Sequence, residues 1–187
     1  HEDHGLALVA EQLQQVLLNL VLNAEQAMPQ IVAQNPKAQL IIAGHGPLRE
    51  RMEANAHPSV KFLGYLTHRE LSWIMPCCDV GVFPSLVKES GPMVFLEALS
   101  CGCFPIATYF AGAKNKIDTV APYLGEDAGY MKLRVDHVAE DMVPAVTGAL
   151  TVSDKYAATM RRIAEEEYDW RPIAAKLADT LEGVARG

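Results

Sequence analysis

Two glutamates, Glu89 and Glu97, have the type and spacing best suited to chemistry in this chain. They are eight positions apart, and the sequence predicts Glu89 in a loop and Glu97 within the helix that follows. Pro92 suits the first helical position, so the amides of Met93 and Val94 have no partner inside the helix and can attract a phosphate group. A plainer interpretation is also open, in which Glu89 favours the positive end of the helix dipole and Glu97 lies on a solvated helix face.

The elements around these glutamates are a strand, a loop, a helix and a second strand. The first strand is predicted at Val80–Phe83, the helix begins near Pro92, and the second strand is predicted at Phe104–Thr108 after a Cys-Gly-Cys turn. This unit has about the length that a parallel crossover connection needs. Because strands alternate with helices along the chain, we expect an α/β fold with a Rossmann-like doubly wound parallel sheet, whose ligands bind beyond the carboxyl ends of the strands.

The stretch from Glu89 to Glu97, ESGPMVFLE, resembles the E-x7-E signature of retaining nucleotide-sugar glycosyltransferases such as glycogen synthase, sucrose synthase and bacterial mannosyltransferases. In that family the first glutamate lies beside the donor sugar and phosphates, and the second binds the ribose hydroxyls. The resemblance therefore implies a catalytic role for Glu89 and donor binding by Glu97. It also implies donor contacts from Ser90, Gly91, Met93 and Val94. The family usually has Phe-Gly where this chain has Gly91-Pro92, so one amide donor to the phosphates is missing.

Two further segments resemble donor-binding loops of the same family. A predicted strand at 39–43 is followed by Gly44-His45-Gly46-Pro47. Glycines there let the backbone approach a ligand closely, although they also suit an ordinary turn. The resemblance implies donor contacts from Gly44 and Gly46, and places Leu63, Gly64 and Tyr65 near the nucleotide base. The implied ligand is a UDP- or GDP-linked sugar, with no metal ion and no further cofactor.

Composition limits the classes of function. The chain has 187 residues, half of them hydrophobic, which predicts a single domain over 1–187. A net charge of −7 without any Lys/Arg-rich run argues against a nucleic acid as partner. The start of the chain lacks a basic signal-peptide region, and the apolar run Val16–Leu22 is too short to span a membrane, so we expect a cytoplasmic protein. The spacing of the cysteines does not fit a zinc site and predicts small buried thiols at Cys77, Cys78, Cys101 and Cys103.

Residues 1–35 are predicted to form an atypically long apolar helix. Within it, residues 11–28 resemble the N box of sensor histidine kinases, where an asparagine at the position of Asn23 helps to hold the magnesium of ATP. The glycine-rich boxes that complete such a site have no counterpart downstream, so we do not expect a magnesium-ATP role for Asn19 or Asn23. An alternative is that a kinase-like segment separates two halves of one glycosyltransferase helix.

Later elements are predicted from capping residues and periodicity. Thr67 and Glu70 fit a capping box, with a helix that ends near Met75. A last strand is predicted near Ala128–Tyr130, and three helices follow it at about 135–150, 153–166 and 170–185. The closing segment resembles the terminal helix of the glycosyltransferase family, which implies that Trp170 packs into the core.

The resemblance runs from about Pro29 to the C-terminus and implies the C-terminal, donor-binding half of the GT-B architecture, with its first strand missing. In that architecture catalysis occurs between two Rossmann-like halves. The Arg and Lys that clamp the donor diphosphate belong to the missing strand, and His4 stands where the lysine would be, although a neutral imidazole is a poor replacement. Because the first strand is central, its loss leaves sheet edges that favour pairing with another chain. We therefore expect a GT-B N-terminal half or a second copy as partner, in a homo-oligomer or swapped dimer.

Two functions are compatible with these residues. The first is the donor-binding domain of a retaining glycosyltransferase, which moves a hexosyl group from a nucleotide sugar to an acceptor and is incomplete as an enzyme on its own. The alternative is a non-catalytic interaction or oligomerisation module with a vestigial sugar-nucleotide site. Pro92 and the missing basic pair favour the module, whereas the retained glutamates and glycines favour the transferase.

Overall fold

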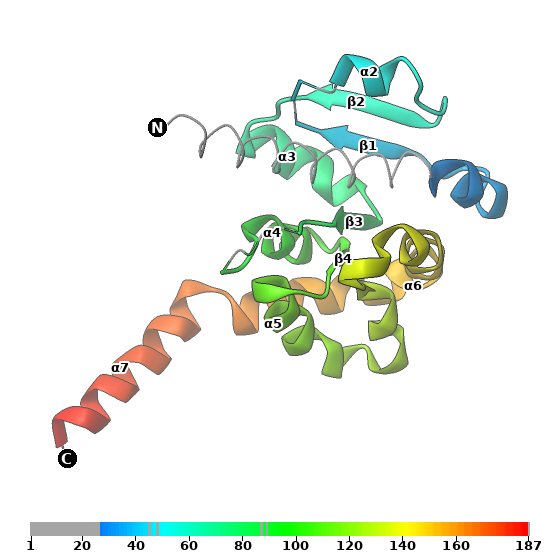
Figure 1. The fold of residues 1–187 in the computed structure, drawn as a ribbon. Coiled ribbons are helices and arrows are strands. Elements are labelled where there is room, and N and C mark those ends of the chain that lie inside the picture. Colours follow the sequence, from blue (N-terminus) through cyan, green and yellow to red (C-terminus); the bar gives the residue numbers. More distant parts are fainter. Residues whose placement is uncertain (1–26, 45, 48, 87, 89, 187) are drawn as a thin grey trace, which may run out of the picture.

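The computed structural model of the protein describes residues 27–186 apart from 45, 48, 87 and 89 (Figure 1). Residues 27–34 are helical. The helices and strands that follow are β1 (Leu40–Ala43), α2 (Arg49–Glu53), β2 (Val60–Gly64), α3 (His68–Ile74), β3 (Val80–Phe83), α4 (Met93–Cys101), β4 (Phe104–Thr108), α5 (Ala111–Val120), β5 (Lys132–Leu133), α6 (Val138–Glu167) and α7 (Trp170–Arg186). Short 3₁₀ helices lie at Met75–Cys77, Ala121–Tyr123, Gly125–Met131 and Val135–His137.

The strands form two parallel sheets (Figure 1). β1 pairs with β2, and β4 lies between β3 and β5. The order is therefore β2-β1 in one sheet and β3-β4-β5 in the other, with no described strand between β1 and β3. A doubly wound Rossmann sheet has the order 3-2-1-4-5-6, so the position left open among the described residues is that of the first strand. The predicted Rossmann-like α/β fold is confirmed for the described part of the chain.

β1 and β3, which lie on either side of this open position, are less buried than β4, which lies farther from it. All five residues of β4 are buried, whereas all four residues of β3 are only half-buried. In β1 the side chain of Ile41 is 39% exposed. Strand edges without a ladder partner present N–H and C=O groups that favour pairing with a further strand. β1 and β3 are therefore the edges at which this sheet can be completed.

The hydrophobic core lies around β4, which contacts α4, α5 and α6. Phe104 and Ile106 of β4 are fully buried in it. The helical residues 27–34 pack Met28 and Ile31 into the same core. Most of the predicted N-terminal helix, including nearly all of the histidine-kinase-like segment, lies outside the described residues.

α6 is one continuous helix where the sequence predicts two, at 135–150 and 153–166. Its buried residues recur at helical spacing from Val138 to Ala164, and they include Ala149 and Ser153 on the two sides of the predicted gap. This stripe packs against β4 and α4. Tertiary packing of an apolar face therefore keeps the helix intact through Pro144 and past residue 152.

Two predictions near the C-terminus are wrong. The segment Gly125–Met131 is a 3₁₀ helix instead of a strand, and the short strand β5 follows it, pairing with Ala107 and Thr108. Trp170 is 80% exposed instead of buried in the core, because α7 extends away from the rest of the chain (Figure 1).

The capping box of α3 is confirmed. The amide of Glu70 donates to Thr67 Oγ1 at 3.3 Å, and the amide of Thr67 donates to Glu70 Oε2 at 2.8 Å. The helix ends at Ile74 and passes into the 3₁₀ turn Met75–Cys77, so its predicted end is correct to one residue.

The four cysteines are free thiols in different surroundings. Cys103 is buried, and its burial raises the pKa of the thiol to about 12. Cys77 is exposed, so the prediction of four buried thiols is wrong at this position, which ends a 3₁₀ turn outside the core. Among the described residues, no three His, Cys, Asp or Glu side chains are grouped to hold a metal ion.

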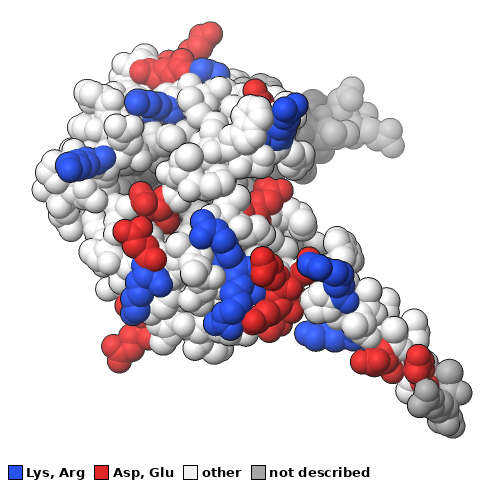
Figure 2. All heavy atoms as spheres, turned by 180° about the vertical axis from the view of Figure 1, so that it is seen from behind, with Lys and Arg blue, Asp and Glu red and all other residues white. Residues whose placement is uncertain are grey.

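No helix in the described part of the chain is long and apolar enough to cross a membrane. On the face shown in Figure 2, acidic and basic side chains lie interspersed over the surface. Several of them form ion pairs, such as Arg134 Nη2 with Asp141 Oδ1 at 2.7 Å.

The packing of α6 gives a first test. Truncating the fully buried Met160 to alanine should lower the free energy of unfolding by about 2–5 kcal/mol, because it leaves a cavity beneath a continuous helix. Truncating Leu177 on α7, which is 58% exposed, should change it by less than about 0.5 kcal/mol. Urea unfolding followed by circular dichroism measures both, and equal losses would contradict the packing of α6.

Candidate donor-binding site

The predicted donor-binding residues follow the carboxyl ends of strands in both sheets. Gly44 comes directly after β1, and Gly64 is the last residue of β2. The loop 84–92 leads from β3 to α4. Parallel sheets bind their ligands beyond these strand ends. The elements that follow β2 and β3 also approach each other, as the contact of Glu97 with His68 described below shows.

Gly44 and Gly64 fix the turn region beyond β1 and β2. The amide of Gly44 donates to the carbonyl of Gly64 at 2.6 Å. Both have left-handed backbones, with φ of 120° at Gly44 and 73° at Gly64, which favours glycine. A Cβ on Gly64 would lie 2.7 Å from Arg49 Nη1. The two glycines therefore have a structural role here, whatever they contact in a ligand.

The loop before α4 rests directly on the first turn of α5. A Cβ added to Gly112 would collide with the carbonyl of Ser90 and the amide nitrogen of Gly91. Gly112 is buried, so backbone lies against backbone at this point. Only glycine permits this approach. The contact holds Ser90 and Gly91, two of the predicted donor residues, just ahead of the N-terminus of α4.

Ala111 occupies the turn that opens α5 with a φ of 47°, a left-handed conformation that is unfavourable for an L-residue with a Cβ. The backbone here has the conformation that a glycine would favour, and the alanine adopts it at a cost.

α4 begins one residue later than predicted. Pro92 is the N-cap, with an extended backbone, and Met93 is the first helical residue. Pro92 still lacks an N–H, and the amides of Met93 and Val94 still belong to the first turn, whose N–H groups have no partner within the helix. The side chain of Met93 is 65% exposed. The helix therefore directs its positive end beyond the sheet, as the sequence predicts.

Glu97 lies in the second turn of α4 and faces α3. Its Oε1 is 3.7 Å from Nδ1 of His68, the first residue of α3. The Glu97 side chain is 35% exposed, so it remains accessible to a ligand, and that of His68 is 92% exposed. The position of His68 beside Glu97 could not be read from the spacing in the sequence, because β3 and its loop separate the two residues.

The remaining predicted residues differ in accessibility. Leu63 and Tyr65, at the end of β2, are 41% and 70% exposed. Gly46 lies in the exposed turn after β1. Glu89, the predicted catalytic residue, lies outside the described residues.

Two lysines of α5 lie near this site and differ in their partners. Lys114 Nζ pairs with Asp118 Oδ2 at 2.7 Å, and this hydrogen-bonded ion pair raises the pKa of Lys114. Lys116 instead reaches the donor loop, with its Nζ 3.1 Å from the position that a Cβ on Gly91 would occupy. The sequence analysis missed Lys116. The signal for it is its spacing of four residues from Gly112, which places both on one face of α5.

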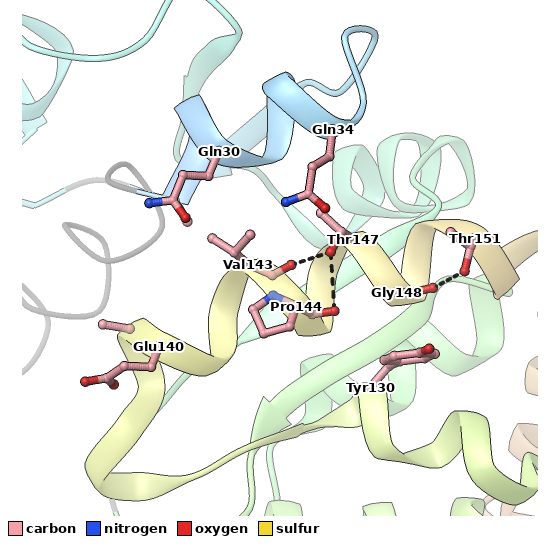
Figure 3. Close-up of a pocket in the computed structure, with 11 residues that line it drawn as sticks. Gln30, Gln34, Tyr130, Glu140, Val143, Pro144, Thr147, Gly148 and Thr151 are labelled. Carbon is pink, nitrogen blue, oxygen red and sulfur yellow. Dashed lines mark hydrogen bonds between the residues drawn. The ribbon is translucent and has the colours of Figure 1, made fainter.

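A separate cavity of about 840 Å³ lies on another part of the protein, between the helical residues 27–34 and α6 (Figure 3). The side chains of Gln30 and Gln34 extend from the first helix toward α6 (Figure 3). The hydroxyls of Thr147 and Thr151 donate to carbonyls of their own helix. None of the predicted donor-binding residues lines this cavity.

Comparison with known sequences identifies the family. The sequence profile of the family "Glycosyl transferases group 1" matches residues 19–151, so the chain belongs to this family. The match begins inside the segment that resembles a histidine-kinase N box. It includes the loop before α4 and the start of α5.

Characterised relatives cover most of the chain. It is 26% identical over 170 residues to the GDP-mannose-dependent monoacylated alpha-(1-6)-phosphatidylinositol monomannoside mannosyltransferase of Corynebacterium glutamicum, an alignment that includes 86% of this chain and 43% of the relative. It is 27% identical over 176 residues to the glycogen synthase of Mycobacterium tuberculosis, with 88% of this chain and 40% of the relative covered. The chain thus spans less than half the length of these relatives.

Solved structures show the same fold. HepE from Anabaena, crystallised in complex with UDP-glucose, superposes with a TM-score of 0.60 over 85% of this chain and 45% of that protein, at 20% identity. WaaG, a glycosyltransferase involved in lipopolysaccharide biosynthesis, superposes with a TM-score of 0.58 over 76% of this chain and 39% of that protein, at 17% identity. The fold is that of the Rossmann-like C-terminal half of GT-B glycosyltransferases.

The strained turn at the start of α5 gives a second test. Replacing Ala111 by glycine should raise the free energy of unfolding by up to about 1 kcal/mol, because glycine relieves the left-handed strain. The matched change Ala113→Gly, in the regular part of the same helix, should lower it by about 1 kcal/mol. Urea denaturation of the two variants beside the parent chain measures both, and a loss of similar size in each would show that residue 111 is unstrained.

Proposed function

We propose that this chain is the donor-binding part of a retaining glycosyltransferase that takes a hexosyl group from a UDP- or GDP-sugar. Membership of the family supports the class of reaction. The observation that carries the assignment to this site is the Ser90–Gly91 loop, which is held on Gly112 ahead of the N-terminus of α4, with Glu97 in the next turn.

The chemistry follows from the charges at this site. Transfer breaks the bond between the anomeric carbon of the sugar and the diphosphate, and negative charge grows on the departing nucleoside diphosphate. Amides at the N-terminus of α4 and the partial positive charge of the helix dipole would stabilise that charge. In this proposal the amides of Met93 and Val94 contact the phosphates, and Glu97 accepts hydrogen bonds from the ribose hydroxyls. Glu89 lies beside the donor sugar.

The other predicted contacts belong to the nucleotide. The exposed residues Leu63 and Tyr65 would receive the base, next to Gly64 and its hydrogen bond to Gly44. Because the chain spans less than half of its relatives, we propose that the acceptor is bound by a separate N-terminal half and that transfer requires it. A cytoplasmic location is part of the proposal, supported by four free cysteines of the kind found in reducing compartments.

Calorimetric titration with UDP, GDP, ADP and their glucose or mannose conjugates, with and without magnesium, tests the donor site. One nucleotide sugar should bind saturably. Replacing Glu97 by glutamine should then weaken that binding about ten- to hundredfold, because a charged acceptor of hydrogen bonds is lost.

The change Glu126→Gln is the matched control, since Glu126 is an exposed glutamate in a 3₁₀ helix. It should leave the affinity unchanged. If Glu97→Gln binds the nucleotide sugar with unchanged affinity, Glu97 does not bind the ribose hydroxyls. No binding of any nucleotide by the parent chain would favour the alternative, an interaction module with a vestigial site.

A specific observation also supports association with another polypeptide. Among the described residues no strand lies between β1 and β3, and α7 exposes an apolar stripe. The residues of this stripe that are more than half exposed are Trp170, Leu177, Leu181 and Val184. We propose that the chain forms a dimer or swapped assembly when no N-terminal half is present.

Sedimentation equilibrium over a wide range of protein concentration tests this association. A mass that rises toward twice the chain mass of 20.4 kDa is expected. The double change Leu177→Glu and Leu181→Glu on exposed positions of α7 should reduce the association if α7 takes part in it. A clean monomer at all concentrations would contradict the proposal.

A further inference from the structure

Lys116 on α5 is a cation that the structure brings against the donor loop, at Gly91. Gly112 and Lys116 are one helical turn apart on the face of α5 that meets Ser90 and Gly91. Gly112 allows the two backbones to touch, and Lys116 then extends along the loop. A Cβ on Gly91 would lie 2.8 Å from Lys116 Cε and 3.1 Å from Nζ, so the absence of a side chain on Gly91 leaves room for the ammonium group.

The charge of Lys116 is not compensated by a carboxylate among the described residues. Its ammonium lies 5.1 Å from the centre of the Tyr168 ring. Burial lowers the pKa of Lys116. Lys114 on the same helix, by contrast, is paired with Asp118. Lys116 is thus a partly buried lysine beside the donor loop for which the described residues provide no ion pair.

The position of this ammonium is unfavourable in the absence of an anion. It lies beside Gly91, two residues before the first turn of α4, where the helix dipole is also positive. The ammonium of Lys116 and the positive end of the α4 dipole repel each other. An anion that lies between them is attracted by both. The first-strand Arg and Lys that the family resemblance implies for the donor diphosphate have no described counterpart in this chain.

We propose that Lys116 binds the diphosphate of the nucleotide-sugar donor, together with the amides of Met93 and Val94. This assignment rests on the proposed donor site and names the positive group that the site needs. The ammonium turns from the Tyr168 ring toward the phosphates, and it stabilises the charge on the departing nucleoside diphosphate. A lysine can do this as a mobile point charge on a flexible stem.

The experiment compares Lys116→Met with Lys114→Met. Both changes remove one positive charge from α5, so they alter the overall field equally. The nucleotide sugar that the parent chain binds, its free nucleoside and inorganic pyrophosphate are titrated against each variant by calorimetry. Lys116→Met should lower the affinity for the nucleotide sugar and for pyrophosphate about ten- to hundredfold, while the affinity for the nucleoside stays the same. Lys114→Met should change none of these three affinities by more than about twofold.

A conservative variant separates charge from packing. Lys116→Arg keeps the positive charge and should retain most of the affinity for pyrophosphate, whereas equal losses in the Met and Arg variants would overturn the assignment. Circular dichroism and the thermal midpoint verify that each variant folds, and Lys116→Gln replaces the Met variant if that one does not.

The outcomes distinguish this assignment from the proposed function. If the parent chain binds a nucleotide sugar and Lys116→Met binds it equally well, the donor site stands and the role of Lys116 is overturned. If the parent chain binds neither a nucleotide sugar nor pyrophosphate, both are overturned.

Discussion

The structure of the candidate donor site depends on one contact between two backbones, that of Gly112 with Ser90 and Gly91. Because no Cβ intervenes, the loop after β3 lies directly on the first turn of α5, which itself follows β4. Two crossover units of the sheet are thereby joined at their carboxyl ends. The N-terminus of α4 and the ammonium of Lys116 both take their places from this contact, and so does the electrostatic character of the site.

A second constraint acts between the two sheets. Glu97 on α4 and His68 on α3 meet at 3.7 Å, although their helices follow strands on opposite sides of the break. The predicted ribose contact therefore lies where the two halves of the sheet approach each other. A Rossmann sheet places its first strand in this position. Whatever completes the sheet between β1 and β3 would consequently also set the spacing between the base-binding and phosphate-binding parts of the site.

The apolar surface that the described residues leave uncovered is concentrated away from β4. It includes Ile41 beside the break and the stripe of α7 from Trp170 to Val184. In contrast, the core around Phe104 and Ile106 is complete, and the helical residues 27–34 contribute to it. The described part of the chain thus combines a well-packed centre with two apolar surfaces that no described residue covers. Both functional interpretations, the donor-binding half and the interaction module, require something to cover these surfaces.

The sequence alone was sufficient for the features that depend on local spacing. The succession of strands and helices predicted the α/β fold, Thr67 and Glu70 predicted the start of α3, and the E-x7-E pattern identified the loop before α4. Each of these is determined by residues within one turn or one crossover of one another, where propensity, capping and periodicity act.

Only the tertiary structure decided the features that depend on distant packing. The buried stripe of α6 continues through Ser153 because it packs against β4. Trp170 is exposed because α7 extends away from the rest of the chain. Lys116 belongs to the candidate site because Gly112, one turn before it, lies against Gly91, more than twenty positions earlier in the sequence. Such contacts arise from the way the crossovers stack, and no pattern within a single element encodes them.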